Sequence, residues 1–372
     1  MSQPTQRCPV RDFLERGVAA RRMPAAAWSV ACRERVVSRG AIGHAVLEPT
    51  VEPSSDDTPF DLASLTKPLC TALLLVLAEA DGSLALDAPI SEFVEEMGGS
   101  AFADASLIEL AVHAARLPAW RPLYLAGSDA SSFAAQIARE RPAVDDGESL
   151  YSDLGYVLLG IAIERTAGAT LDTLFAQRVA RPLGLARLGF AAPGVRFADA
   201  AATERGNRYE RVLAGRAGRA FGWRRSVIRG EVHDGNAFAL GGVAGHAGLF
   251  GPIAEVAALA RELLDPHVLP LGGKARVRLF EPYRAGTSRT VGWILARGAR
   301  AAAGILPDSA PGHTGFTGTS IWLDPDAGRS FVLLTNRVHP EVRGGGFDPV
   351  RRGFHRVAAA VARSASGEQP LQ

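Results

Sequence analysis

Hydrophobic positions near the two ends of the chain follow the short patterns that are typical of β-strands. An amphipathic helix with Val10, Phe13, Leu14 and Val18 on one side comes first, and two apolar runs joined by a polar turn follow it. Strand patterns return after Gly286, and a helical pattern closes the chain. The predicted elements at the ends are a helix at 10–22, strands at 25–32, 36–47, 289–297, 319–325 and 330–338, and a helix near 348–363.

The middle of the chain has mostly helical spacing, interrupted by glycine and proline. A long apolar helix is predicted from Pro68 to Ala80 and ends at the turn Asp81-Gly82. The Arg- and Gly-rich stretch 204–232 predicts a long surface excursion. The clearest further helices are 106–115, 130–140, 153–168, 171–184 and, after a glycine-rich turn at 239–252, 253–264.

Strands at both ends with helices between them predict one sheet built from the two termini. A helical subdomain would be inserted in its middle, and 372 residues are enough for two such parts. We expect a single domain over 1–366, with a sheet subdomain at about 1–62 and 286–366 and an inserted subdomain at about 63–285. A disordered tail at 367–372 is expected to follow.

Composition excludes several classes of protein. A net charge of +2, with no basic run interleaved with aromatics, argues against nucleic-acid binding. The three cysteines are widely spaced, so we expect reduced thiols, no metal site and no cofactor. The N-terminal stretch lacks an apolar core, and the longest apolar run, Leu69 to Ala78, is about half of a membrane span. We therefore expect a cytoplasmic protein that does not contact membranes, while its oligomeric state stays open.

Lysine is rare in this chain, which makes each lysine a candidate for chemistry. Of the 41 basic residues only Lys67 and Lys274 are lysines, and only lysine readily loses its proton in a protein. Lys274 lies in a loop-like stretch with no candidate partner nearby, so we assign it to the surface.

Ser64 and Lys67 form the first candidate catalytic pair. On a helix, residues three apart lie on one face, so the amine can reach the hydroxyl and activate it as a nucleophile. Burial and the positive helix N-terminus both disfavour the charged lysine. Pro68 biases Lys67 away from helical angles, so either the first turn is distorted or the helix begins at Pro68.

Two further segments carry candidate groups. Tyr151, in Tyr-Ser-Asp, becomes a proton relay if it lies beside a lysine, although by itself the motif better fits a buried tyrosine at a helix start. The segment from His313 to Phe316 precedes a predicted strand; an edge strand beside the nucleophile supplies a backbone N–H for an oxyanion, and Gly315 allows close approach. No GxSxG, HExxH, Walker-type loop or GxGxxG unit competes with these segments.

In order and spacing, the three segments resemble the SxxK, YxN and KTG motifs of serine β-lactamases and penicillin-binding proteins. The resemblance is closest to the branch of class C β-lactamases, D-aminopeptidases and esterases, and covers roughly 25–340. It extends to FDLASLTKP, RLPAWRPLYL, YSDLGYVLLG, HDGNAFALGGVAGHAGLF, GHTGFTGTSIWLDP and LLTNRVHP.

The resemblance implies an α+β fold, with an antiparallel sheet flanked by helices and the active site between the sheet and the helical part. It also implies a serine hydrolase in which Ser64 forms an acyl-enzyme while Lys67 and Tyr151 move protons. The backbone N–H groups of Ser64 and Phe316 would form the oxyanion hole.

Two departures from the motifs bear on the substrate. Asp153 replaces the Asn of YxN, and a carboxylate there favours charged Lys67, so we favour Tyr151 over Lys67 as the base. His313 replaces the lysine of KTG, which in β-lactamases helps to bind the antibiotic's carboxylate, and a histidine is mostly neutral at pH 7.

Asp153, His313, Thr314 and Gly315 are expected to contact the substrate, an ester or an amide such as a D-amino-acid peptide. A true β-lactamase or DD-carboxypeptidase, and a non-catalytic binding protein on the same fold, are the alternatives. The roles of His233 and His246, in loops similar to those of the family, stay open, as does that of Trp120 between cleft wall and core.

Overall fold

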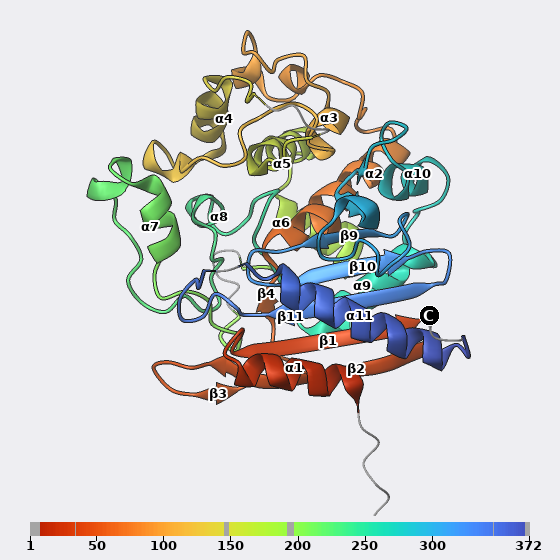
Figure 1. Ribbon diagram of the computed structural model, residues 1–372. Coiled ribbons are helices and arrows are strands. Elements are labelled where there is room, and N and C mark those ends of the chain that lie inside the picture. Colours follow the sequence, from red (N-terminus) through yellow and green to blue (C-terminus); the bar gives the residue numbers. More distant parts are fainter. Residues whose placement is uncertain (1–7, 34, 145–148, 192–196, 345, 369–372) are drawn as a thin grey trace, which may run out of the picture.

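An antiparallel sheet forms the base of the protein, and a small sheet, β4-β6-β5, lies in the helical part described below. The computed structural model describes residues 8–33, 35–144, 149–191, 197–344 and 346–368 (Figure 1). The sheet has eight strands in the order β3-β2-β1-β11-β10-β9-β8-β7, and every pairing is antiparallel. Its strands are β1 (Ala25–Cys32), β2 (Arg35–Val46), β3 (Glu52–Pro53), β7 (Arg289–Thr290), β8 (Trp293–Leu295), β9 (Pro311–Thr314), β10 (Ser320–Asp324) and β11 (Arg329–Thr335). The predicted sheet made from both ends of the chain and the α+β fold class are confirmed.

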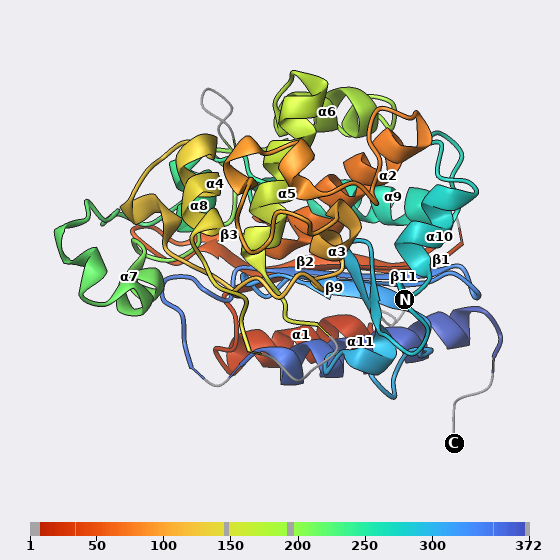
Figure 2. The same cartoon turned by 90° about the horizontal axis from the view of Figure 1, so that it is seen from above.

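Helices cover both faces of this sheet. The first and last helices, α1 (Pro9–Ala19) and α11 (Asp348–Ala365), lie side by side on one face (Figure 2). Their apolar stripes bury Trp28, Trp322 and Phe331 of the sheet in one core. On the other face α9 (Ile253–Leu264) packs against β1, β10 and β11. Because α9 comes from the stretch 63–285, that stretch contributes a sheet-covering helix as well as the helical part.

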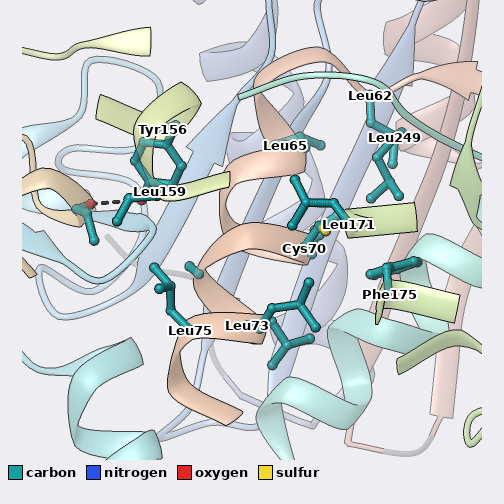
Figure 3. Close-up of a cluster of buried hydrophobic side chains, with 14 of the residues drawn as sticks. Leu62, Leu65, Cys70, Leu73, Leu75, Tyr156, Leu159, Leu171, Phe175 and Leu249 are labelled. Carbon is teal, nitrogen blue, oxygen red and sulfur yellow. Dashed lines mark hydrogen bonds between the residues drawn. The ribbon is translucent and has the colours of Figure 1, made fainter. Parts of the chain in front are cut away.

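The helical part stands on the same face as α9 and is organised around the apolar helix that follows Ser64. Figure 3 shows leucines of this helix packed against α5, α6 and β6, with the Tyr156 hydroxyl donating to the Ala111 carbonyl at 2.8 Å. The elements of this part are β4 (Phe60–Asp61), α2 (Leu73–Ala80), α3 (Leu107–Ala111), α4 (Ala130–Ala138), α5 (Asp153–Ala167), α6 (Leu171–Phe175), β5 (Gly189–Phe190), α7 (Arg208–Ala214), α8 (Gly235–Ala239), β6 (Leu249–Gly251) and α10 (Lys274–Phe280).

The helix after Ser64 has a distorted start. A 3₁₀ turn at Ala63–Leu65 leads into a π-helix at Lys67–Ala72, and regular α-helix begins only at Leu73. Pro68 has no N–H to donate and its ring excludes the carbonyl four residues earlier, so a wider turn replaces the α-helical one. Of the two predicted arrangements the distorted first turn is therefore present, and the prediction of a helix starting at Pro68 is wrong.

Three other predicted elements differ from the structure. The strand predicted at 289–297 is the β7–β8 hairpin, because Gly292 has a φ of 87° and turns the chain. The helix predicted at 106–115 ends at Ala111, since His113 adopts a left-handed φ of 61°. The helix predicted at 171–184 becomes a π-helix at Ala176–Ala180. Residues 369–372 of the predicted disordered tail lie outside the described residues.

By length and composition, one helix, Ala63–Ala80, would suffice to cross a membrane, and the bent pair Asp153–Ala167 and Leu171–Ala180 passes the same test together. Within Ala63–Ala80, 78% of the residues are buried in the protein, which is the position of a core helix. The expectation that no membrane is involved stays a prediction.

Candidate active site

Ser64 lies on a strained turn at the wall of a cleft beside the sheet. The preceding residue, Ala63, has a left-handed φ of 49°, which costs free energy in a residue other than glycine. Asp61 holds this turn, because its Oδ1 accepts the Ala63 N–H at 2.8 Å and its Oδ2 accepts the His233 N–H at 2.8 Å. The Ser64 side chain is half-buried and lines a cavity of about 610 Å³. The loop thus presents one hydroxyl to the cleft at a fixed place.

Lys67 is completely buried directly beneath Ser64. Its Nζ lies 2.9 Å from Ser64 Oγ, 3.1 Å from the His246 carbonyl oxygen and 2.7 Å from Asp153 Oδ1. Burial lowers the pKa of Lys67, but the Asp153 carboxylate and Tyr151 outweigh burial and hold this pKa above its usual value. Lys67 is therefore charged in the resting site. This was expected, because Asp153 stands where the YxN motif has an asparagine.

Tyr151 completes a group of three with Ser64 and Lys67. Lys67 Nζ lies 5.0 Å from the centre of the Tyr151 ring. Burial raises the pKa of Tyr151, while Lys67 and a hydrogen bond with the Ser64 hydroxyl partly offset this rise. The phenol is consequently protonated at rest. The structure brings together the three residues for which the sequence predicted catalysis, but it does not test their roles.

The start of α5 fixes Tyr151 and Asp153. Ser152 is the N-cap of this helix, and its hydroxyl also donates to the Pro118 carbonyl at 2.7 Å. Asp153 begins the helix, so its carboxylate sits at the positive helix end as well as beside Lys67. The alternative of Tyr151 as a mere buried tyrosine at a helix start does not account for its interactions with both Ser64 and Lys67.

His113 supports Tyr151 and was missed by the sequence analysis. Its ring centre lies 4.6 Å from that of Tyr151, and its Nδ1 accepts the Ser152 N–H at 3.1 Å. Burial holds the pKa of His113 well below its usual value, with Arg289 and Lys67 adding to the effect, so the ring is neutral. A neutral histidine whose Nδ1 accepts carries its proton on Nε2. No sequence motif marks His113, because the contact joins segments 38 residues apart.

Arg289 is a second cleft residue that the sequence placed only in a strand. Its guanidinium carbon lies 5.9 Å from the Tyr151 ring centre, and its Nε donates to Ser149 Oγ at 3.2 Å. Together with Lys67 it lowers the pKa of His313 as well as that of His113. Arg289 thus contributes positive charge at the catalytic end of the cleft.

His313 lies on strand β9. The sequence predicted that the segment from His313 to Phe316 precedes a strand, not that it begins within one. β9 pairs with β10 on one side and with β8 on the other, so it is not an edge strand over its whole length. β8 pairs only with Pro311 and Gly312, however, so His313 and Thr314 extend beyond it along the cleft. Burial, Lys67 and Arg289 hold the pKa of His313 well below its usual value. His313 is therefore neutral, and the contact of its Nδ1 with the Thr314 carbonyl at 2.9 Å puts its proton on Nδ1.

The turn after β9 packs against the loop that leads to Ser64, the nucleophile loop of the proposal below. A Cβ on Gly315 would lie 2.6 Å from the Leu62 carbonyl oxygen and 2.1 Å from Thr319 Oγ1, so only glycine fits there. Thr319 Oγ1 donates to the Leu62 carbonyl at 3.1 Å, and Thr317 Oγ1 donates to that of Asp61 at 2.8 Å. Phe316, next to Gly315, lines the cleft. Gly315 thus lets the turn pack closely against the backbone of Leu62, while its expected contact with the substrate stays a prediction.

His233 and His246 have structural partners. His233 Nε2 lies 3.1 Å from Glu204 Oε2, and His246 Nε2 lies 2.8 Å from Asp234 Oδ1. His246 also positions Lys67 through its backbone carbonyl. Trp120 lines the cleft with them. Among the residues that the structure describes, no group of three or more His, Cys, Asp or Glu side chains is placed to hold a metal ion.

Comparison with known proteins agrees with this geometry. A family model described as Beta-lactamase matches residues 10–351. A protein of Escherichia coli K12 with the provisional name D-alanyl-D-alanine carboxypeptidase is 30% identical over 336 residues, which are 81% of this chain and 74% of that protein.

Solved structures share the fold at lower identity. A class C β-lactamase from Rhodobacter sphaeroides superimposes with a TM-score of 0.72 at 19% identity, over 95% of this chain and 99% of that one. EstCE1, described as a hydrolase with promiscuous acyltransferase activity, gives 0.69 at 20% identity, over 95% and 97%. These likenesses establish the fold.

Proposed function

The chain belongs to the Beta-lactamase family of serine hydrolases, and we propose that it cleaves esters or amides through an acyl-enzyme on Ser64. The observation that carries this proposal is the contact of Ser64 Oγ with Lys67 Nζ at 2.9 Å, with Tyr151 beside both. A hydroxyl, an amine and a phenol within reach of one another in a cleft are the parts that acyl transfer needs.

The pKa directions of Lys67 and Tyr151 support one route for the proton movements. Lys67 is charged and Tyr151 is neutral, so neither is a base as it stands. Asp153 Oδ1, 2.7 Å from Lys67 Nζ, takes one proton from Lys67, and the buried ion pair becomes a neutral pair. The free amine of Lys67 then removes the Ser64 proton. This assignment replaces Tyr151, which we favoured from the sequence, by Lys67 as the base.

Acylation then balances as follows. Ser64 Oγ bonds to the substrate carbonyl carbon, the oxyanion forms, and the bond to the leaving group breaks. Tyr151 gives its proton to the leaving group and is reprotonated by Lys67, which in turn recovers a proton from Asp153. The net transfer is one proton from Ser64 to the leaving group. In deacylation, water takes the place of Ser64 as the nucleophile and Ser64 becomes the leaving group. The same groups move the protons, and the acid is released.

A second candidate function, DD-carboxypeptidase activity, is favoured by the Escherichia coli relative at 30% identity. The neutral His313 weighs against it, because the lysine of the KTG motif is absent and with it one charge for a substrate carboxylate. We therefore place ester and amide substrates without a carboxylate first. The cytoplasmic location remains part of the proposal.

The test is labelling of Ser64 by a fluorophosphonate, followed by intact mass spectrometry. Wild type, Ser64→Ala and the control Ser91→Ala, in the turn Ile90–Glu92 away from the cleft, are compared. We expect one adduct on wild type and on Ser91→Ala and none on Ser64→Ala. Turnover of p-nitrophenyl acetate, D-alanine p-nitroanilide, nitrocefin and a D-Ala-D-Ala-terminated peptide then distinguishes the substrate classes. No adduct and no turnover above Ser64→Ala would favour a non-catalytic binding protein.

A further inference from the structure

Two buried or half-buried arginines bind the two consecutive carbonyls of the turn that follows β9. Arg351, on α11, donates from Nη2 to the Gly315 carbonyl oxygen at 2.5 Å. Arg337, which follows β11, donates from Nε to the Phe316 carbonyl oxygen at 2.8 Å. The Gly318 N–H also donates to the Gly315 carbonyl, at 3.0 Å. Both peptide units at the tip of this turn are thus held from the side of the C-terminal helix.

Holding the Gly315 carbonyl also fixes the Phe316 N–H, because both belong to one planar trans peptide and point in opposite directions. Within the described ranges this N–H donates to no other residue. Gly315 and Phe316 line the same cleft as Ser64. A cationic donor on the carbonyl also polarises the peptide and strengthens its N–H as a donor. We propose that Arg351 is a positioning residue that aims and polarises the Phe316 N–H as an oxyanion-hole donor.

The burial of Arg351 supports a functional reason for its presence. Its side chain is 8% exposed, and burial lowers the pKa of Arg351 to about 10. Asp348 Oδ1 accepts from Nη1 at 3.0 Å, while Nε has no partner in the part of the chain that the structure describes. A buried, incompletely paired guanidinium contributes little to stability compared with an apolar side chain of similar length. The hydrogen bond of Arg351 to the Gly315 carbonyl therefore explains the presence of a buried guanidinium better than a contribution to protein stability does.

The turn is also tied to the nucleophile loop, so the position of the Phe316 N–H relative to Ser64 depends on both attachments. Thr317 and Thr319 bind the carbonyls of Asp61 and Leu62 on the loop side. Arg351 binds from the opposite side. Loss of Arg351 leaves the loop attachments in place, so we expect the turn to stay folded while its first peptide gains freedom to rotate.

The test compares Arg351→Met with Arg352→Met. Arg352 is the next residue on α11, and its Nη1 donates to the Ala303 carbonyl at 2.7 Å rather than to the turn. With p-nitrophenyl acetate, which is uncharged, we expect Arg351→Met to lose about 10- to 100-fold in kcat with little change in KM, somewhat less than removal of an oxyanion donor costs. Fluorophosphonate labelling should slow in parallel, because the phosphoryl oxygen occupies the same hole. Arg351→Lys should recover part of the rate, and Arg352→Met should match wild type.

The outcomes separate this inference from the proposed function on which it rests. Absence of labelling at Ser64 in wild type would overturn both. Normal labelling of wild type, with Arg351→Met as active as Arg352→Met, would overturn the positioning role alone. A higher KM for an anionic ester with unchanged kcat for the acetate would also overturn it, because Arg351 would then be a substrate contact. Thermal unfolding of each variant verifies folding, and Arg351→Lys serves as the test if Arg351→Met does not fold.

Discussion

Replacement of Asp153 by Asn tests the buried ion pair at the centre of the site. Lys67 is completely buried, Asp153 is 19% exposed and their charged atoms lie 2.7 Å apart. At an effective dielectric constant of 20 their attraction is about 6 kcal/mol before desolvation is subtracted. Removal of one partner from a buried pair leaves the other charge uncompensated and costs about 3–5 kcal/mol. We therefore expect Asp153→Asn to lose about 3–5 kcal/mol of unfolding free energy at pH 6.

The pH dependence of this loss follows from Lys67. In wild type the pKa of Lys67 is raised above its ordinary value, so its stabilisation is fully present below that value and is lost only as pH rises through the raised pKa. Without Asp153, burial dominates and lowers the pKa of Lys67 below its unfolded value. The folded variant then binds a proton less readily than the unfolded chain, so its stability rises with pH. We expect the deficit relative to wild type to shrink from pH 6 to pH 9.

Activity should show the same contrast. In the proposed mechanism the proton of Lys67 passes to Asp153 within the site, so we expect kcat/KM of wild type for p-nitrophenyl acetate to be nearly flat between pH 6 and 9. In Asp153→Asn, Lys67 must lose its proton to solvent, so kcat/KM should climb over that range.

The measurements are urea unfolding and kcat/KM at pH 6, 7, 8 and 9, with Asp199→Asn as the control. Asp199 is a 60% exposed partner of Arg187 and should cost at most about 1 kcal/mol with no change in pH dependence. Equal stability of Asp153→Asn and wild type at pH 6, with parallel pH profiles, would refute the reasoning.

Two further substitutions test the proposed role of Tyr151 as a proton donor and the close packing at Gly315 in the turn after β9. Tyr151→Phe should lower kcat on p-nitroanilides by about 10²- to 10⁴-fold with little effect on KM, because the leaving amine then lacks its proton donor; an unchanged kcat would rule out this role. Gly315→Ala should abolish activity and lower the unfolding temperature, since its Cβ would lie 2.1 Å from Thr319 Oγ1. Gly344→Ala should leave both unchanged, because its Cβ would meet no described residue within 4 Å apart from its chain neighbours. Steady-state rates and thermal scans of the two alanine variants decide this second case.

Much of the architecture could be predicted because its signals are local. The strand at 25–32 and the helix at 253–264 have their predicted bounds, since each is an apolar or amphipathic run of ordinary length. β9 was not predicted as a strand, because Gly312 and His313 lie among glycines and carry no alternation. Gly292 splits a predicted strand through its left-handed φ, and glycine is required there by tertiary packing, because a Cβ would lie 2.4 Å from Ala72 Cβ.

The candidate site also combines contacts that could be predicted from local sequence with contacts that could not. Ser64 and Lys67 are three residues apart, so their contact follows from helical spacing even where the turn is distorted. Tyr151 and the segment at His313 could be joined to them only through resemblance to a family. His113 and Arg351 could not be found, because each acts through a backbone or ring contact with a segment that is distant in sequence.

The two departures from the family motifs, Asp153 and His313, both make the site less positive. With Asn at 153 and a charged lysine at 313, the catalytic end would hold the positive charges of Lys67, the second lysine and Arg289. In this chain Asp153 neutralises Lys67 at 2.7 Å, and His313 is neutral because burial and the neighbouring cations lower its pKa. The first change offsets the charge of Lys67 and the second removes a charge that would bind a carboxylate. We therefore expect both to shift selectivity from anionic substrates such as β-lactams toward uncharged esters and amides.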